Sequence, residues 1–213
     1  MPSPTTDAIY RISLLRHGES VGNADGYHQG QSEFDLTIKG RKQAQALANR
    51  WLNEGKTFDQ AIASPLSRTR QTAEIISQKL CLPLKFNSLW MEVNIGQLSG
   101  LKPDDAKEKF PPPDFTHPYL PLGGTGESRW ELYLRGGQAI QDLLGNPPGD
   151  YLIISHGGIL NMVLYAILGI IPQANFYGPR FHFENTAFAS LTYEPDHHRW
   201  RVWGVNDHLH WLE

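Results

Sequence analysis

Two arginines and two histidines of the sequence stand at or shortly after the ends of apolar runs: Arg16, His17, Arg68 and His156. A guanidinium group presents a planar fork of N–H donors that matches the oxygens of phosphate, and a neutral imidazole has a nitrogen lone pair that can attack phosphorus. Taken singly, either arginine could pair with a surface carboxylate. Four such groups at one point would make little sense without an anion to hold. The residues therefore predict an anion-binding site, provided that the fold gathers them.

The apolar runs before these residues are predicted strands, over residues 10–15, 58–63 and 151–155. Helices are predicted over residues 38–54, 67–80 and 128–144, and within the apolar stretch 159–171. This alternation predicts an α/β fold, a three-layer α/β/α sandwich with a mostly parallel central sheet. Ligands of such sheets bind beyond the carboxyl ends of the strands. Helices that begin just after Ser64 and His156 would add N–H groups to the same edge.

The rest of the chain predicts shorter elements and one long loop. A brief strand is expected at residues 84–86, and two more over 186–193 and 200–205 around the turn Glu194-Pro195-Asp196. Ser128 and Glu131 form a capping box at the start of the helix 128–144. Residues 96–126 are rich in Pro and Gly and predict a lid-like excursion with at most one short helix, near residues 104–109. We expect a single domain over residues 1–213.

Five short motifs give the chain a family resemblance. Residues 14–20 read LLRHGES, residues 64–73 read SPLSRTRQTA and residues 155–158 read SHGG. DLTIKG at residues 35–40 and LWME at residues 89–92 lie between them. In this order, over about residues 10–190, they resemble the histidine phosphatase superfamily, which includes the cofactor-dependent phosphoglycerate mutases. The resemblance implies a phosphoglycerate mutase-like fold and a phosphohistidine intermediate, in chemistry that requires no metal or cofactor.

The resemblance also implies a role for each motif residue. His17 would be the nucleophile, and Arg16, Arg68 and His156 would neutralise the non-bridging oxygens of the phosphoryl group. Glu92 would protonate the leaving alkoxide and then activate water for hydrolysis of the phosphohistidine. These five residues are the expected catalytic set.

A second group of residues is expected to bind the substrate. Asn23 and Gln29, in the loop after the first motif, would add neutral donors. Gly30 follows Gln29 in that loop, and Gly157 belongs to the motif SHGG. Glu127, in the sequence Gly-Glu-Ser, could stand at the pocket edge or could act as a charge in the first turn of the following helix.

The excursion is expected to set specificity. Trp90, Phe115, His117 and Tyr119 are candidates for the pocket wall, although Trp90 could equally belong to the core. Ser99 stands where many members of the family have a carboxylate, and this departure leaves the pH optimum open.

The shared motifs do not separate mutases from phosphatases. Between Glu92 and His156 lie 63 residues, fewer than in the glycolytic mutases, and we find no tyrosine- and lysine-containing block of the kind that grips bisphosphoglycerate there. The spacing favours a phosphomonoester hydrolase of the broad-specificity phosphatase branch, acting on a small phosphorylated metabolite. Two alternatives stay open: a cofactor-dependent phosphoglycerate mutase, and a non-catalytic protein that binds a phosphate ligand in regulation.

Composition narrows the setting of this chemistry. With 213 residues, 40% of them hydrophobic, and a net charge of −3, the chain is typical of a globular domain and lacks the basic excess of a nucleic-acid binder. Cys81 is the single cysteine; it excludes an intrachain disulfide and is predicted to be a small buried side chain. The first ten residues show no secretory signal, and no stretch is long enough to span a membrane, so we expect a cytoplasmic protein.

Two further features of the sequence carry weaker expectations. The histidines near the C-terminus lack the Cys or carboxylate spacing of a metal site and are expected to be surface residues: they are His197, His198, His208 and His210. Apolar residues of the hairpin 186–205 could pair two chains in a homodimer.

Overall fold

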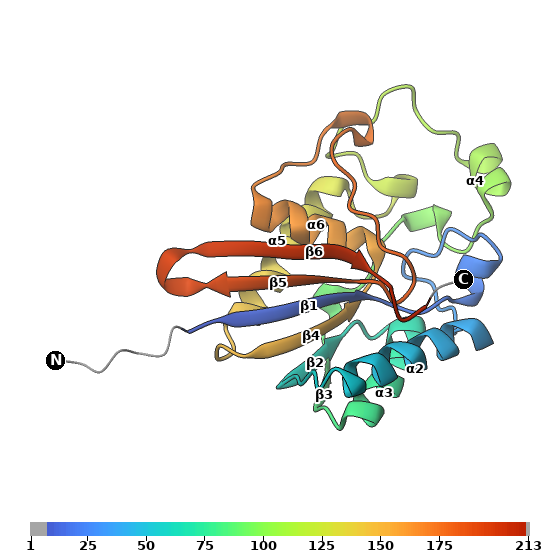
Figure 1. Ribbon diagram of the computed structural model, residues 1–213. Coiled ribbons are helices and arrows are strands. Elements are labelled where there is room, and N and C mark those ends of the chain that lie inside the picture. The colour runs from blue at the N-terminus through green and yellow to red at the C-terminus, as the bar shows by residue number, and fades with distance from the viewer. Residues whose placement is uncertain (1–7, 212–213) are drawn as a thin grey trace.

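The computed structural model describes residues 8–211 of the chain, so most of the segment on which the expectation about a secretory signal rests lies outside the described residues (Figure 1). Its strands are β1 (Tyr10–Arg16), β2 (Gln60–Ala63), β3 (Leu84–Phe86), β4 (Asp150–Ser155), β5 (Phe188–Glu194) and β6 (Arg199–Asp207). They form one sheet in the order β3-β2-β4-β1-β5-β6. The first four strands run parallel, whereas β5 is antiparallel to β1 and β6 is antiparallel to β5.

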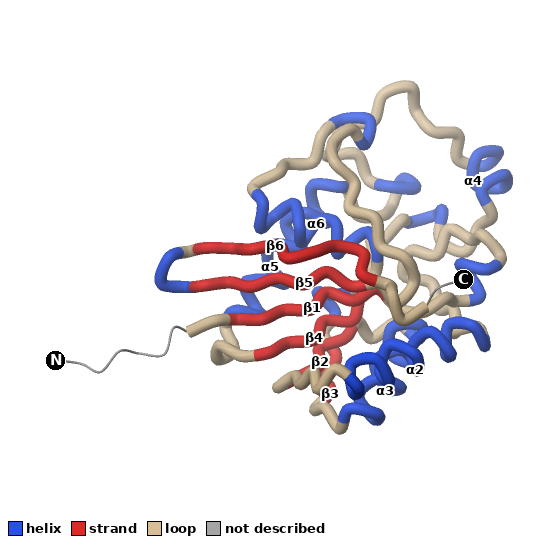
Figure 2. Tube along the Cα trace, viewed as in Figure 1, coloured by secondary structure: helices blue, strands red, loops and turns tan. Residues whose placement is uncertain are grey.

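Helices cover both faces of the sheet (Figure 2). They are α1 (Val21–Ala24), α2 (Ile38–Asn53), α3 (Ser67–Leu80), α4 (Pro103–Lys109), α5 (Arg129–Leu144) and α6 (Gly157–Leu168). The α2 and α3 helices pack on one face and α5 and α6 on the other, while α4 stands apart in the long excursion (Figure 1). The predicted three-layer α/β/α sandwich is therefore confirmed.

The central strand β4 shows why the sheet needs two covering layers. Its side chains alternate between the faces. Tyr151 and Ile153 enter the core beneath α5 and α6, and Leu152 and Ile154 enter the core beneath α2 and α3. All four are buried, so a strand covered on both sides reads as a continuous apolar run.

Most predicted elements are found within two residues of their expected ends. The capping box is confirmed: Ser128 Oγ accepts from the Glu131 N–H at 3.2 Å, and Glu131 Oε2 accepts from the Ser128 N–H at 2.7 Å. The apolar helix ends earlier than the apolar stretch does, because Gly169 adopts a left-handed conformation with φ of 68°. Within the excursion α4 matches the one expected helix, and two 3-10 turns flank it, at Gly96–Leu98 and Leu122–Gly124.

The prediction for Cys81 is wrong. Its side chain is exposed, and its backbone has a φ of 55° directly after the last residue of α3. Cys81 therefore occupies the turn that ends the helix, where the chain leaves the core and reverses toward β3.

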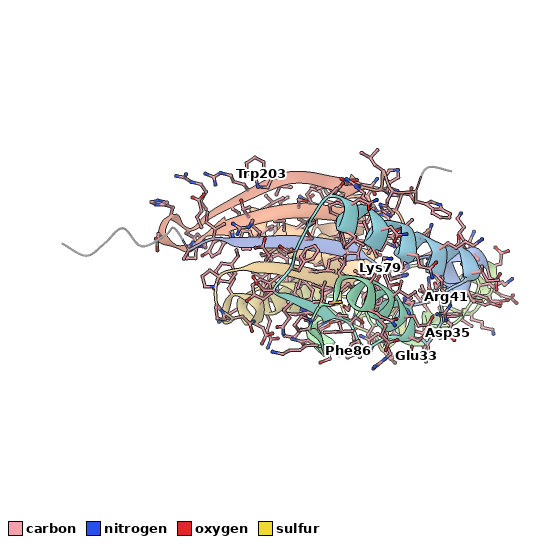
Figure 3. All side chains as sticks on the ribbon, turned by 60° about the horizontal axis from the view of Figure 1, so that its bottom comes forward. Glu33, Asp35, Arg41, Lys79, Phe86 and Trp203 are labelled. Carbon is pink, nitrogen blue, oxygen red and sulfur yellow. The ribbon has the colours of Figure 1, made fainter. Side chains whose placement is uncertain are left out.

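The two edge strands carry exposed apolar side chains. Trp203 on β6 and Phe86 on β3 lie at opposite edges of the sheet (Figure 3), and they are 68% and 38% exposed. Trp203 and its neighbour Val202 match the apolar surface expected on the hairpin, and the homodimer stays a prediction. In the described part of the chain, no helix combines the length and the apolar character that a membrane span needs.

Candidate active site

The strand ends gather the predicted residues at one edge of the sheet. β1 ends in register with β4, with Arg16 opposite Ser155. Beyond the strands, the His17 N–H donates to the Ser155 carbonyl at 3.0 Å, and the Ser64 N–H donates to the Ile154 carbonyl at 3.0 Å. The segments that follow β1, β2 and β4 therefore start side by side, as expected for a ligand site on a parallel sheet.

His17 is held as a neutral imidazole with one free nitrogen. Its side chain is buried, and Nδ1 lies 2.7 Å from the carbonyl oxygen of Gly18. A carbonyl oxygen only accepts, so Nδ1 carries the proton and Nε2 keeps its lone pair. Burial, with the positive charges of Arg68 and Arg16, lowers the pKa of His17 well below its usual 6.5. At neutral pH this imidazole is an uncharged nucleophile.

Two guanidinium groups, that of the buried Arg68 and that of the partly buried Arg16, act on His17 and have no carboxylate partner among the described residues. Arg68 is 1% exposed and donates through its two terminal nitrogens to the carbonyls of Ser32 at 2.9 Å and Gly30 at 2.7 Å, while its Nε has no partner among the described residues. Arg16 donates to the Phe183 carbonyl at 2.6 Å. Burial lowers the pKa of Arg68 to about 10 and also lowers that of Arg16, yet both stay charged at neutral pH. Such charges are stabilised when an anion enters.

His156 presents a buried ring nitrogen to the same point. Its Nε2 lies 2.9 Å from Ser64 Oγ, and its Nδ1 is buried without a partner among the described residues. Its ring packs edge-on against that of His17, with centroids 5.1 Å apart. Burial, with the charge of Arg68, lowers the pKa of His156 well below 6.5. If the Ser64 hydroxyl donates to Nε2, Nδ1 carries a proton that is free to bind an anion.

Glu92 lies at the N-terminus of α6. Its two carboxylate oxygens accept hydrogen bonds from the backbone N–H groups of Gly158 at 3.1 Å, Ile159 at 3.2 Å and its neighbour Val93 at 2.9 Å. A Cβ added at Gly158 would stand 2.3 Å from a Glu92 carboxylate oxygen, so only glycine allows this approach. These bonds fix the orientation of the carboxyl group at the wall of the cavity.

Glu127 was a candidate for substrate binding at the pocket edge, but it does not line the cavity. Its carboxylate accepts from Arg135 Nε at 2.7 Å and Nη2 at 2.8 Å, and from the Asn94 N–H at 3.1 Å. Arg135 also donates to the carbonyls of Met91 at 2.7 Å and Glu92 at 3.1 Å. Glu127 and Arg135 therefore brace the segment that carries Glu92.

The loop after β1 contributes amide groups. The side-chain oxygens of Asn23 and Gln29 take part in hydrogen bonds with Ser20 Oγ, at 2.9 and 2.7 Å, and these bonds leave both amide nitrogens available as donors. Gln29 and Gly30 line the cavity, whereas Asn23 does not. Gly30 has a φ of 47°, in the region that favours glycine, and its carbonyl holds Arg68.

A cavity of about 640 Å³ opens over these groups. Its wall includes seven of the predicted site residues: Arg16, His17, Gln29, Gly30, Arg68, Glu92 and Gly157. His156 lies fully buried behind the wall.

Sequence reasoning missed the outer part of the cavity. The segment of residues 176–183, between α6 and β5, forms much of the wall, together with Arg129 and Tyr165. The only available signal was the clustering of aromatic and basic residues in FYGPRFHF, which has no periodicity to place it.

The excursion contributes less to the wall than expected. Leu122 is its only described residue there. Phe115 and Tyr119 are 59% and 60% exposed, and neither they nor His117 line the cavity. Trp90 is fully buried in the core beneath α5 and α6, which settles its two alternatives.

Two of the C-terminal histidines each have a separate side-chain partner in the structure. His210 Nε2 lies 2.9 Å from Thr186 Oγ1, and His198 Nδ1 lies 3.0 Å from the Tyr193 hydroxyl. Among residues 8–211, no three His, Cys, Asp or Glu side chains come together as a group that could hold a metal ion.

Comparisons with known proteins identify the family to which the chain belongs. The family model of the histidine phosphatase superfamily, branch 1, matches residues 12–206. A curated relative from Escherichia coli, named a probable phosphoglycerate mutase, is 33% identical over 87% of this chain and 86% of its own length.

Two solved structures are similar in fold. Phosphoserine phosphatase from Entamoeba histolytica, in complex with 3-phosphoglyceric acid, has a TM-score of 0.78 and 23% identity, over 95% of this chain and all of its own. A mycobacterial glucosyl-3-phosphoglycerate phosphatase, in complex with VO3, has a TM-score of 0.76 and 24% identity, over 92% of this chain and 99% of its own. From the family match and the curated relative together, we conclude that this chain belongs to branch 1 of the histidine phosphatase superfamily.

Proposed function

We propose that this protein is a phosphomonoester hydrolase that acts through a phosphohistidine on a small phosphorylated metabolite. The observation that carries the proposal is the state of His17: a buried, neutral imidazole whose Nδ1 binds the Gly18 carbonyl and whose Nε2 is free. Around it stand Arg16, Arg68 and His156, with the buried Arg68 Nε and His156 Nδ1 unpartnered among the described residues. These donors match the oxygens of a phosphoryl group in transfer.

In the first step His17 Nε2 attacks phosphorus, the N–P bond forms and the P–O bond to the leaving group breaks. The two arginines and His156 stabilise the charge on the non-bridging oxygens. Glu92, when protonated, gives its proton to the leaving alkoxide. In the second step Glu92 takes a proton from water, the oxygen attacks phosphorus and the N–P bond breaks, which releases phosphate and restores His17.

Hydrolysis is favoured over phosphoglycerate mutation by the chain between Glu92 and His156. It holds 63 residues, and the only part of the described excursion that reaches the cavity is Leu122. The two neighbours in fold are named phosphatases, whereas the curated relative is named a probable mutase, so mutation of phosphoglycerates is the second candidate.

The test measures phosphate release from a panel of phosphorylated metabolites and, in parallel, mutase activity with bisphosphoglycerate. We expect release by the wild type, a loss of about 10³-fold or more in His17→Ala, and no mutase activity. Acid quenching during turnover should trap an acid-labile phosphoryl group on the wild type and none on His17→Ala.

Other results would change the assignment. Mutase activity without release would keep the site and replace the hydrolase with a mutase. No activity of either kind, with tight vanadate binding, would identify a protein that only binds phosphate ligands.

A further inference from the structure

The cavity extends well beyond the groups that would hold a phosphoryl unit. At about 640 Å³ it falls within the range of sites for whole small molecules. The outer wall is largely apolar and includes Leu132, Met162, Tyr165, Phe176 and Phe181. Two arginines that the catalytic steps do not use, Arg129 and Arg180, interrupt this apolar wall.

The charges that line the cavity exceed what one phosphate needs. Four guanidinium groups line it, from Arg16, Arg68, Arg129 and Arg180, and Glu92 is the one acidic side chain of the described wall. Four positive charges and one negative charge leave a net charge of three. A phosphate dianion neutralises two, so a positive charge remains for a further anionic group.

Arg129 lines the cavity, and its Nε donor has no hydrogen-bond partner among the described residues. It is the first residue of α5, and its guanidinium carbon lies 4.8 Å from the ring centroid of Phe176. Such stacking uses the face of the guanidinium group and leaves the in-plane N–H groups free. Its Nε is buried without a hydrogen-bond partner in the described chain, and the Tyr165 hydroxyl and the Arg180 charge both act on its guanidinium group. Burial lowers the pKa of Arg129, so anion binding would compensate an existing cost.

Arg180 lines the same cavity and is an exposed residue. Its positive charge contributes, after burial, to the lowered pKa of both Arg16 and Arg129. Neither Arg129 nor Arg180 forms an ion pair with a carboxylate of the described residues. The nearby Glu184 is paired with His182 at 2.8 Å.

We propose that Arg129 and Arg180 form a second anion subsite, and that the preferred substrates are phosphomonoesters whose leaving group has an apolar body ending in a carboxylate or a second phosphate. The inference rests on the proposed function, because it takes Arg16, Arg68 and His17 as the phosphoryl end. The apolar wall then contacts the body of the substrate, and the two arginines bind its far end.

Two synthetic substrates isolate the second charge. 4-Carboxyphenyl phosphate and 4-carbamoylphenyl phosphate have nearly the same size and shape, but only the first carries a second anion. We expect the wild type to have a kcat/KM at least tenfold higher for the carboxylate, mainly through a lower KM.

Variants assign that preference to residues. Arg129→Gln and Arg180→Gln should each remove most of the preference while they change kcat/KM for the carbamoyl substrate less than threefold. The matched control is Arg11→Gln, since Arg11 is also a partly exposed arginine but pairs with Asp150 at the opposite end of β1. It should keep the full preference.

Binding separates this inference from the proposed function. On His17→Ala, calorimetry with the same two compounds measures the subsite without turnover, and the carboxylate should bind at least tenfold more tightly. Equal affinities, or a preference that survives both arginine substitutions, would overturn the second subsite even if hydrolysis is confirmed. A tenfold preference in binding, lost in Arg129→Gln, would support the subsite even if the wild type releases no phosphate.

Discussion

The inner and outer halves of the cavity are built from different kinds of structure. The inner half consists mainly of residues at or beyond the carboxyl ends of the parallel strands, where main-chain bonds such as the one from the His17 N–H to the Ser155 carbonyl join the segments. The outer half is formed largely by the segment 176–183 and the start of α5. In the inner half Arg68 is 1% exposed, whereas in the outer half Phe176 is 50% exposed.

This difference indicates how the molecule divides its tasks. Phosphoryl transfer requires donors placed within fractions of an ångström, and a sheet edge buried between two layers provides that rigidity. Recognition of the leaving group tolerates looser placement, and loops on a rigid scaffold commonly provide it. Substitutions in the inner half should therefore reduce kcat for all substrates, and those in the outer half should act on some substrates through KM.

Among substitutions that keep the nucleophile His17, the largest effect is expected for Glu92→Gln in the inner half. The amide cannot transfer a proton, so kcat for an alkyl phosphate should fall by about 10²- to 10⁴-fold. With 4-nitrophenyl phosphate, whose leaving group needs little protonation, the loss should be much smaller. Equal losses on the two substrates would contradict the general-acid role.

A smaller effect, about tenfold in kcat, is expected for Arg135→Gln. Arg135 supports the Glu92 segment through the carbonyls of Leu89, Met91 and Glu92 and through the Glu127 carboxylate, without lining the cavity itself. Because it acts through Glu92, its loss should fall on alkyl phosphates more than on 4-nitrophenyl phosphate. If the role of Arg135 were merely structural, its loss would reduce kcat for both substrates alike. It would also lower the thermal midpoint of unfolding, which circular dichroism measures.

Much of the inner half could be predicted from the sequence because Arg16, His17 and His156 stand at the ends of strands that the sequence itself identifies. An apolar run such as 151–155 identifies a strand buried on both faces, and parallel strands bring their carboxyl ends together. The distances could not be predicted. Which nitrogen of His17 carries the proton depends on the Gly18 carbonyl, a contact with no signature in the sequence.

The outer half could not be predicted from the sequence, and the reasons are physical. Gly123 at φ of 54° and Asn175 at φ of 53° turn the chain where no regular period exists, so sequence spacing gives no direction for the side chains. The sequence left two hypotheses for Glu127, a place at the pocket edge and a charge in the first turn of the helix. The structure shows a third role, an ion pair with Arg135. The prediction that Cys81 is buried was wrong because apolar character alone does not reveal the turn at the end of a helix.

The buried histidines of the inner half should make stability fall with acid. Burial lowers the pKa of His17 and of His156 well below 6.5, so as the pH falls below that value the unfolded chain binds more protons than the folded chain. The free energy of unfolding then rises with pH, by up to about 1.4 kcal/mol per pH unit for each histidine. Urea titrations at several pH values measure this slope in the wild type and in His156→Asn. The slope should be smaller in the variant by the amount that corresponds to about one bound proton. An unchanged slope would mean that His156 titrates alike in both states.

The smallest effect is expected for Phe115→Ala, and it tests where the outer half ends. Phe115 is 59% exposed in the excursion and absent from the cavity wall, so its removal should change kcat and KM less than twofold for any phosphomonoester. Leu122→Ala is the matched comparison, since Leu122 belongs to the same excursion and does line the cavity. We expect it to raise KM severalfold for substrates with an apolar body and to leave compact alkyl phosphates unchanged. A rise in KM from Phe115→Ala would show that the excursion closes over bound substrate, and the outer half would then include side chains that the open cavity does not contact.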